Sequence, residues 1–443
     1  MNPANPASIT FRSAPDSRPN VYDLGIEKLA ALVTGWGEPA YRARQVLHWL
    51  YRELVTDFSQ MTNLPVNLRR RLAAHLRIGS ARLVAQKISS DGWTRKVLLE
   101  MRDGATIEAV LMLYYDRATV CVSSQVGCAM GCSFCATGQM GFTRNLTAGE
   151  IVEQVLWFNR WLRQHPHRPP LPRDGRPRYH GGPAHMAGAR RHHDAHRNYD
   201  VHQAGQEMWH INDGVYAPGG PREISSVTNI VFMGMGEPLV NYNNLWKAIR
   251  IINSPQGLAL GARRMTVSTV GIVPQIRRFA REDLPVNLAV SLHAPDDELR
   301  SRMMPINLYY PISELMDACR EYIQATRRRI TFEYVLIRGV NDSLEQAHRL
   351  AGLLKGMLCH VNLIPLNPVP GTGMQATPRG QVFAFQKVLE EAGISTTVRI
   401  ERGVDIAAAC GQLKVEHEPG SHHRSLNPEL VQAHVQADLA STL

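Results

Sequence analysis

The chain of 443 residues contains no run of about 18 or more apolar residues, the length that a membrane-spanning helix requires. Its first twenty residues are rich in Pro, Asn and Ser and lack the apolar segment of a secretory signal. Neither secretion nor membrane insertion is indicated, so we expect a cytoplasmic protein. We expect residues 1–20 to form a disordered leader.

Cysteine is also scarce, with seven residues in the whole chain. Three of them share the run CAMGCSFC at 128–135, which fits a reducing compartment better than a disulfide framework. Cys128, Cys132 and Cys135 have the spacing C-x3-C-x2-C, and three thiolates can hold three irons of a four-iron cluster and leave the fourth open. The run offers no fourth ligand for a zinc knuckle or a closed ferredoxin cluster, although zinc or a chance cluster is the alternative interpretation. Phe134, within the run, would shield a cluster from water.

Positive charge is in excess, with a formal net charge of +10. Such a balance suits a polyanionic partner such as RNA, but it also describes many solvated surfaces. Residues 21–80 predict a domain of two or three small helices, one capped by Asp23 and another over 41–54. Its arginines predict either an RNA-binding face or a merely solvated one: Arg42, Arg44, Arg52 and the triplet 69–71.

Turn signals and apolar runs predict a small β-meander over 81–117, with hairpins at Asp91-Gly92 and Asp103-Gly104. From 118 to 415 strands and helices alternate, which predicts an α/β fold of parallel strands with its chemistry at their carboxyl ends. The predicted strands are 119–123, 228–233, 264–269, 286–292, 330–337, 361–365 and 396–400. The predicted helices include 147–161, 244–252 and 312–326.

One segment interrupts this alternation. Residues 160–222 contain nine of the eighteen histidines and eight prolines, and are too polar and too broken to predict a strand or a packed helix. We expect an inserted, mobile loop there. Its histidines lack tight ligand spacing, so a metal site is the weaker interpretation. Residues 416–443 are expected to form a disordered tail.

The open iron of such a cluster could be chelated by a ligand with an amino and a carboxylate group, as in S-adenosylmethionine. The cysteine run together with Gly234–Pro238 (GMGEP) after the next strand resembles the radical S-adenosylmethionine superfamily. A closer resemblance is to the RlmN family of ribosomal RNA adenine C2-methyltransferases. It is carried by CVSSQVGC at 121–128, GFTRNL at 141–146, MGMGEPL at 233–239, VSLH at 290–293, LIPLNP at 363–368 and ACGQL at 409–413.

This resemblance implies a partial (β/α) barrel with an N-terminal helical domain and a β-hairpin extension. It implies a [4Fe-4S] cluster held by the cysteine run, S-adenosylmethionine as methyl donor and radical source, and methylation of an adenine in 23S rRNA and in tRNA. An electron donor such as flavodoxin or ferredoxin is expected as a partner, and the chain is expected to be monomeric. The C2 carbon of adenine lies between two ring nitrogens and is too electron-poor to attack a sulfonium methyl directly, so a radical route is needed.

The resemblance also implies roles for three residues outside the cluster. Cys410 matches the cysteine that carries the methyl group, and its pKa should be lowered so that it is nucleophilic. Cys121 matches the partner that frees the product through a transient disulfide. Glu108 matches the acceptor of the C2 proton, although without the resemblance a surface glutamate would be the better interpretation. Cys319 and Cys359 match nothing and are expected in the core.

The implied cofactor-binding residues are Gly236, Glu237, Ser268, Ser291, His293 and Asn367. His293 taken alone would more often be a hydrogen-bonded core histidine. Two other functions stay open. A related resistance enzyme methylates C8 and shares the cluster and both cysteines, and the valine in the run 124–128 favours C2. A non-catalytic RNA-binding protein would keep the basic helices but would not need the cysteines.

Overall fold

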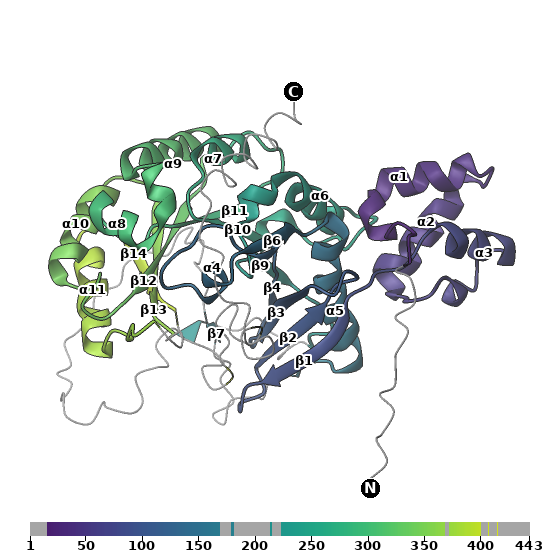
Figure 1. Ribbon diagram of the computed structural model, residues 1–443, viewed down its shortest axis with the longest axis horizontal. Coiled ribbons are helices and arrows are strands. Elements are labelled where there is room, and N and C mark those ends of the chain that lie inside the picture. Colours follow the sequence, from purple (N-terminus) through teal and green to yellow (C-terminus); the bar gives the residue numbers. More distant parts are fainter. Residues whose placement is uncertain are drawn as a thin grey trace, which may run out of the picture.

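The computed structural model describes residues 16–168, 223–367 and 372–399, together with 179–180, 213–214, 406 and 414. Cys410, most of the predicted insert and the predicted tail lie outside these residues. Figure 1 shows a small helical lobe beside a larger lobe built on a curved sheet. No helix in the described part of the chain is long and apolar enough to cross a membrane.

The helical lobe contains the small helices that the sequence predicts. They are α1 (Val21–Gly35), α2 (Ala40–His48) with a π-helical turn at Trp49–Glu53, and α3 (Val66–His75). The predicted cap is wrong, because Asn20 rather than Asp23 begins α1, and its side chain accepts a hydrogen bond from the Tyr22 amide. Asp23 instead accepts from the Gly149 amide at 2.7 Å, so it joins the two lobes. Asn20 is buried, and the predicted disorder does not extend to it.

In the described ranges, ten strands form one sheet in the order β1-β2-β3-β4-β9-β10-β11-β12-β13-β14. Within this part of the chain β1 and β14 lie at the two ends of the order and do not pair with each other, so the sheet is an open, partial barrel. Its strands are β1 (Arg82–Ile88), β2 (Thr94–Glu100), β3 (Thr106–Leu113), β4 (Ala118–Cys121), β9 (Asn229–Phe232), β10 (Met265–Thr269), β11 (Asn287–Ser291), β12 (Ile330–Leu336), β13 (Cys359–Pro365) and β14 (Ser395–Val398).

The two predicted hairpins are present as β1-β2 and β2-β3, and all seven predicted strands are present as β4 and β9 to β14. The hairpin strands do not stand apart from the barrel, since β3 pairs antiparallel with β4. From β4 onward every neighbour is parallel. The carboxyl ends of these strands therefore meet at one edge of the barrel.

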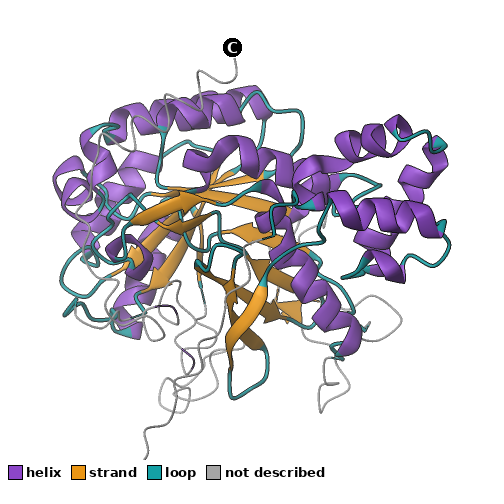
Figure 2. Cartoon of the chain, turned by 45° about the vertical axis from the view of Figure 1, so that its right-hand side comes forward, coloured by secondary structure: helices purple, strands orange, loops and turns teal. Residues whose placement is uncertain are grey.

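The remaining helices are α4 (Ala136–Gln139), α5 (Ala148–Gln164), α6 (Tyr242–Asn253), α7 (Val273–Phe279), α8 (Asp297–Met303), α9 (Ile312–Thr326), α10 (Leu344–Leu354) and α11 (Arg379–Glu391). Figure 1 shows α6, α7, α9, α10 and α11 along the outer face of the sheet, and the turned view in Figure 2 shows helices on the outside of the strands. The Tyr334 ring of β12 lies 5.3 Å from the Phe385 ring of α11. Since side chains alternate along a strand, Glu333 and Val335 face the barrel interior.

Helix α5 corrects the predicted boundary of the insert. It begins with a capping box, in which the Thr147 hydroxyl accepts from the Glu150 amide and the Glu150 carboxylate accepts from the Thr147 amide. It then continues to Gln164, so the first residues of the predicted loop are helical. A β-bridge between His167 and Ile224 brings the two ends of the insert together. Two further strand pieces within it, β7 (Tyr179–His180) and β8 (Asp213–Gly214), pair antiparallel.

Candidate active site

The cysteine run forms a loop that a two-stranded sheet closes at its base. Strand β5 (Gln125–Gly127) precedes the loop and β6 (Phe142–Asn145) follows it. The Cys128 amide donates to the Gly141 carbonyl at 2.8 Å. Gly127 has φ +77°, and a Cβ there would lie 1.9 Å from the Gly141 oxygen, so only glycine fits. The closely approaching backbones hold the loop in a defined position.

Burial sets the chemistry of the three thiols. Cys128 and Cys132 are buried and Cys135 is half-buried. Burial raises the pKa of all three thiols, and the negative charges of their neighbours raise those of Cys128 and Cys132 further. Three thiolates packed together therefore require a cationic group to neutralise them.

The donor set fits an iron-sulfur cluster. Cys128, Cys132 and Cys135 lie on one loop, and a four-iron cluster bonds each of three such thiolates to a different iron. Among the described residues, no group of three or more His, Cys, Asp or Glu side chains could hold a single metal ion.

The cysteine loop packs against the carboxyl-terminal edge of the barrel. The Ser133 amide donates to the Met303 carbonyl of α8 at 3.0 Å. The Phe134 ring meets the His293 ring edge-on, with centroids 4.9 Å apart. His293 is buried, its Nδ1 accepts from the Val335 amide at 3.0 Å, and burial lowers its pKa to about 3. The imidazole is thus a neutral, hydrogen-bonded core group beside the cysteine loop.

Gly236 and Glu237 form the turn after β9. Gly236 has φ +98°, and a Cβ there would lie 2.4 Å from the Cβ of Gln125. The Glu237 carboxylate accepts from the amides of Leu239 at 3.0 Å and Val270 at 2.8 Å. Burial raises its pKa to about 7, because amide donors compensate a buried carboxylate only in part.

The other predicted cofactor residues lie along the same edge. Ser268 and Ser291 are half-buried near the carboxyl ends of β10 and β11, and Ser291 pairs with Glu333 in the register of β11 and β12. Asn367 is half-buried and follows β13. The strands therefore bring together residues that are separated by up to a hundred positions in the sequence.

Glu108 is buried rather than on the surface, so the surface interpretation is wrong. Its carboxylate lies 2.9 Å from the ammonium of Lys96, and both side chains are almost fully excluded from water. Its Oε1 also accepts from the Lys414 amide at 2.7 Å. The Glu108 amide meets the Met235 sulfur at 3.3 Å, which links this ion pair to the turn after β9.

Cys121 ends β4 and pairs with Val110 of β3 and Val231 of β9. It is half-buried, and burial raises its thiol pKa to about 11, against the opposing influence of the Arg399 and Lys96 cations. The thiol is thus the favoured form at neutral pH. Glu108 stands two residues before Val110, so the sheet brings Glu108 and Cys121 together.

Cys319 and Cys359 are buried in the core, as predicted. Sequence analysis missed Lys96, the partner of Glu108. The signal that could have found Lys96 is the register of the hairpin. The Asp103-Gly104 turn pairs Leu98 with Glu108, so Lys96, two residues before Leu98 on the same face, lies diagonally across from the Glu108 carboxylate.

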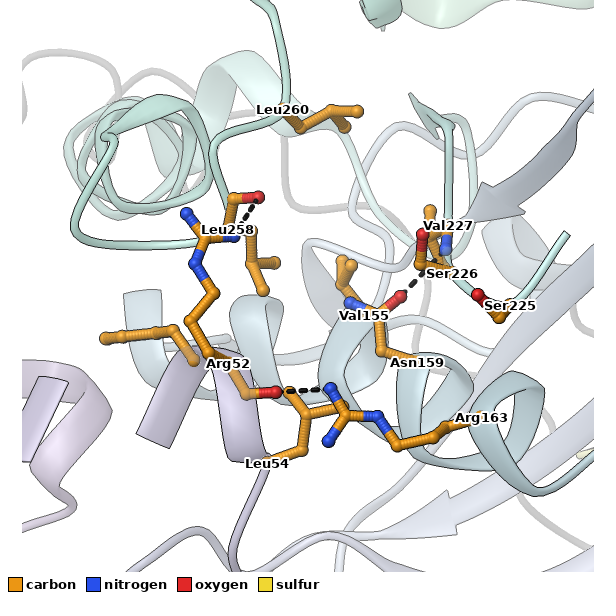
Figure 3. Close-up of a pocket in the computed structure, with 11 residues that line it drawn as sticks. Arg52, Leu54, Val155, Asn159, Arg163, Ser225, Ser226, Val227, Leu258 and Leu260 are labelled. Carbon is orange, nitrogen blue, oxygen red and sulfur yellow. Dashed lines mark hydrogen bonds between the residues drawn. The ribbon is translucent and has the colours of Figure 1, made fainter. Parts of the chain in front are cut away.

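A cavity of about 140 Å³ lies away from the cysteine loop, between the two lobes (Figure 3). Arg52 donates to the Leu258 carbonyl at 3.1 Å, Arg163 donates to the Glu53 carbonyl at 3.1 Å, and Asn159 accepts from the Val227 amide. The cavity contains none of the predicted site residues, and the bonds made by Arg52 and Arg163 join the lobes. Arg52 is thus engaged in this junction instead of lying free on a surface.

Comparison with known proteins agrees with this arrangement. Residues 19–78 match the ribosomal RNA large subunit methyltransferase N-terminal domain, and residues 222–351 match the radical SAM superfamily. A solved radical SAM methyltransferase from Sphaerobacter thermophilus is 46% identical, covers 89% of this chain and 98% of its own, and superposes with a TM-score of 0.74.

Curated relatives are similar over most of the chain. The probable dual-specificity RNA methyltransferase RlmN of Roseiflexus castenholzii is 50% identical over 90% of this chain and 96% of its own length. The protein of that name from Chloroflexus aurantiacus is 47% identical over 90% and 93%.

The partial barrel and its buried cysteine loop define a protein of the radical S-adenosylmethionine superfamily. Within that superfamily the chain belongs to the RlmN family of RNA methyltransferases, and the resemblance noted in the sequence is confirmed.

Proposed function

We propose that this protein methylates C2 of an adenine in 23S rRNA and in tRNA. The observation that carries the proposal is the placement of Glu108 and Cys121 on adjacent strands β3 and β4, at the barrel edge that also holds the cysteine loop. Family membership supports an RNA substrate, and the relatives named above are called dual-specificity enzymes.

The cofactors would be held by residues of this edge. Cys128, Cys132 and Cys135 would ligate a [4Fe-4S] cluster. S-adenosylmethionine would lie over the strand ends, against Gly236, Glu237, Ser268, Ser291, His293 and Asn367. When bound, the reduced cluster supplies the electron that cleaves S-adenosylmethionine to its 5'-deoxyadenosyl radical.

The remaining steps use the chain's own side chains. The thiolate of Cys410 takes a methyl group and so carries the carbon that will bond to C2. The Glu108 carboxylate accepts the proton that C2 loses, and the neighbouring Lys96 ammonium holds that carboxylate in place. The Cys121 sulfur then bonds to the Cys410 sulfur as the bond from that sulfur to the carbon on C2 breaks, and this carbon takes up the proton that Cys121 loses, which releases the methylated base. Because burial raises the pKa of Cys121, its proton must leave during this step.

The partners follow from this chemistry. The exposed Arg44 and Arg70 of the helical lobe are suited to RNA phosphates. Reduction of the cluster requires an electron donor such as a flavodoxin or ferredoxin. Ribosomal and transfer RNA substrates would place the protein in the cytoplasm, and it would act as a monomer.

The two outer cysteines provide the sharpest test. Incubation of Cys121→Ala with labelled RNA should trap RNA joined to Cys410 through a methylene bridge, visible as a nuclease-sensitive shifted band on a denaturing gel. Cys410→Ala should give no such band, and Cys319→Ala, in the core, should behave like the wild type. The assigned roles would have to be withdrawn if both or neither of the first two variants gave the band.

A second measurement identifies the methylated carbon. Mass spectrometry of nuclease fragments from treated 23S rRNA and tRNA should place the new methyl group on C2 of adenine. A methyl group on C8 would support the resistance-type enzyme instead. Absence of iron-sulfur absorbance after anaerobic purification would favour a non-catalytic RNA-binding protein.

A further inference from the structure

Arg300 is the largest side chain that is fully buried in the described part of the protein. It lies on α8, one turn before Met303, whose carbonyl accepts the Ser133 amide of the cysteine loop. Burial lowers its pKa to about 10, so the guanidinium keeps its charge at neutral pH. A buried cation normally has a carboxylate beside it, since an uncompensated charge is costly in a protein interior.

Arg300 has only neutral hydrogen-bond acceptors. It donates to the carbonyls of Val270 at 2.6 Å, Ser291 at 3.2 Å and Leu292 at 3.2 Å, and to the Asn307 side-chain oxygen at 2.8 Å. No carboxylate of the described residues forms a salt bridge with it. The three bonds to carbonyls join the carboxyl ends of β10 and β11, where the proposed cofactor residues lie.

The carboxylate of Asp297, whose charge acts on Arg300, forms its hydrogen bonds with other groups. Its Oδ1 accepts from the Asn307 amide group at 2.9 Å and from the Ile312 backbone amide at 2.8 Å. Its negative charge raises the pKa of Arg300 without a salt bridge, and Asn307 bonds to both side chains. The thiols of Cys132 and Cys319 are the other potential anions near Arg300, and the guanidinium opposes the burial-driven rise in the pKa of each.

The backbone is shaped to admit the guanidinium. Gly271, with φ +104°, follows the Val270 carbonyl, and a Cβ there would lie 3.2 Å from an Arg300 terminal nitrogen and 3.0 Å from Leu315. A side chain at this position would be strained by the positive φ and would press against both Arg300 and Leu315. The turn and the buried cation therefore form one unit.

We propose that Arg300 is a positioning residue whose buried charge is the countercharge of the cluster held by Cys128, Cys132 and Cys135. Three thiolates outweigh the positive charge of an iron-sulfide core, so the loaded loop is anionic and becomes more so on reduction. A fixed cation in a dry interior favours the more negative, reduced form. The same guanidinium holds the ends of β10 and β11 at the cofactor.

The test compares reduction of the reconstituted cluster in three variants. Arg300→Met removes the charge, and Arg300→Lys keeps it but cannot reach all four acceptors. Arg328→Met is the matched control, because Arg328 also donates to backbone carbonyls and to Asn287, but at the amino end of β11. The measurement is a potentiometric titration followed by electron paramagnetic resonance, with iron and sulfide content determined in each sample.

Arg300→Met should make the equilibrium constant for reduction about tenfold less favourable, which is about 59 mV for a one-electron couple. Arg300→Lys should stay within about threefold of the wild type, and Arg328→Met should be unchanged. An unchanged potential in a loaded Arg300→Met protein would overturn the proposal.

If Arg300→Met fails to bind iron, Arg300→Lys decides: a wild-type potential supports the proposal, and a tenfold loss overturns it. The inference rests on the proposed cluster. A wild-type protein without iron and sulfide would contradict that function itself, whereas an unchanged potential contradicts only the role of Arg300.

Discussion

Two buried cations stand on opposite sides of the proposed site and are compensated in different ways. Lys96, at the antiparallel edge of the sheet, lies 2.9 Å from the Glu108 carboxylate. Arg300, on the parallel side, donates only to carbonyl and amide oxygens among the described residues. Removing one member of an ion pair leaves an opposite charge buried, whereas removing Arg300 leaves only neutral acceptors without donors. The difference predicts distinct costs for otherwise similar substitutions.

The largest effect is expected at the ion pair. Lys96→Met should lower the free energy of unfolding by about 3–5 kcal/mol, because the Glu108 carboxylate is then buried without its cation. Urea denaturation of the cluster-free protein would measure the change. The double variant Lys96→Met, Glu108→Leu should recover most of the loss. Equal losses in the single and double variants would show that packing, not charge, is responsible.

Glu237 extends the comparison, because a buried carboxylate can become neutral by binding a proton, whereas an arginine keeps its charge. Its pKa is raised by burial from 4.5 to about 7, so the folded state binds the proton more tightly than the unfolded chain. Its contribution to stability is present below pH 4.5 and lost as the pH rises to about 7, a change of about 3 kcal/mol.

The pH dependence of Glu237 has to be separated from that of His293. Burial lowers the pKa of His293 from 6.5 to about 3, so its contribution is present above pH 6.5 and lost as the pH falls. Urea denaturation of the wild type and of Glu237→Gln between pH 4.5 and 7 would give the difference between their free energies of unfolding. The contribution of His293 is present in both proteins and cancels from this difference. A constant difference between the two proteins across this range would contradict the prediction.

A smaller loss is expected for Arg300→Met in the cluster-free protein. The substitution removes four hydrogen bonds but leaves no opposite charge behind, so the free energy of unfolding should fall by about 1–3 kcal/mol. The measurement is the same urea titration. A loss as large as that of Lys96→Met would show that the two cations are not compensated differently.

The smallest effect is expected for an exposed ion pair near Lys96. Arg82 of β1 is paired with Glu100 of β2, and its side chain is 70% exposed. Arg82→Ala should therefore change the free energy of unfolding by less than about 1 kcal/mol, and the difference should shrink in high salt. A larger, salt-independent loss would mean that position on the sheet matters more than burial.

Local patterns in the sequence were enough to predict most elements and failed where distant contacts decide. The Thr147 capping signal, the Asp-Gly turns and the alternation of strand and helix all depend on neighbours within a few residues. The cap of α1 was mispredicted because Asn20 is buried against the other lobe, while Asp23 bonds to Gly149. Neither contact can be recognised from the residues that are near in the sequence.

The sequence by itself determined the order of strands and helices and the spacing of the three cysteines, because these depend on neighbouring residues along the chain. Only the tertiary structure decided that Glu108 is buried against Lys96 and that Arg300 bonds to carbonyls at the ends of two strands. A charged residue looks the same in sequence whether it faces water or a protein interior. Its role is set by the partners that the folded sheet brings within hydrogen-bond distance.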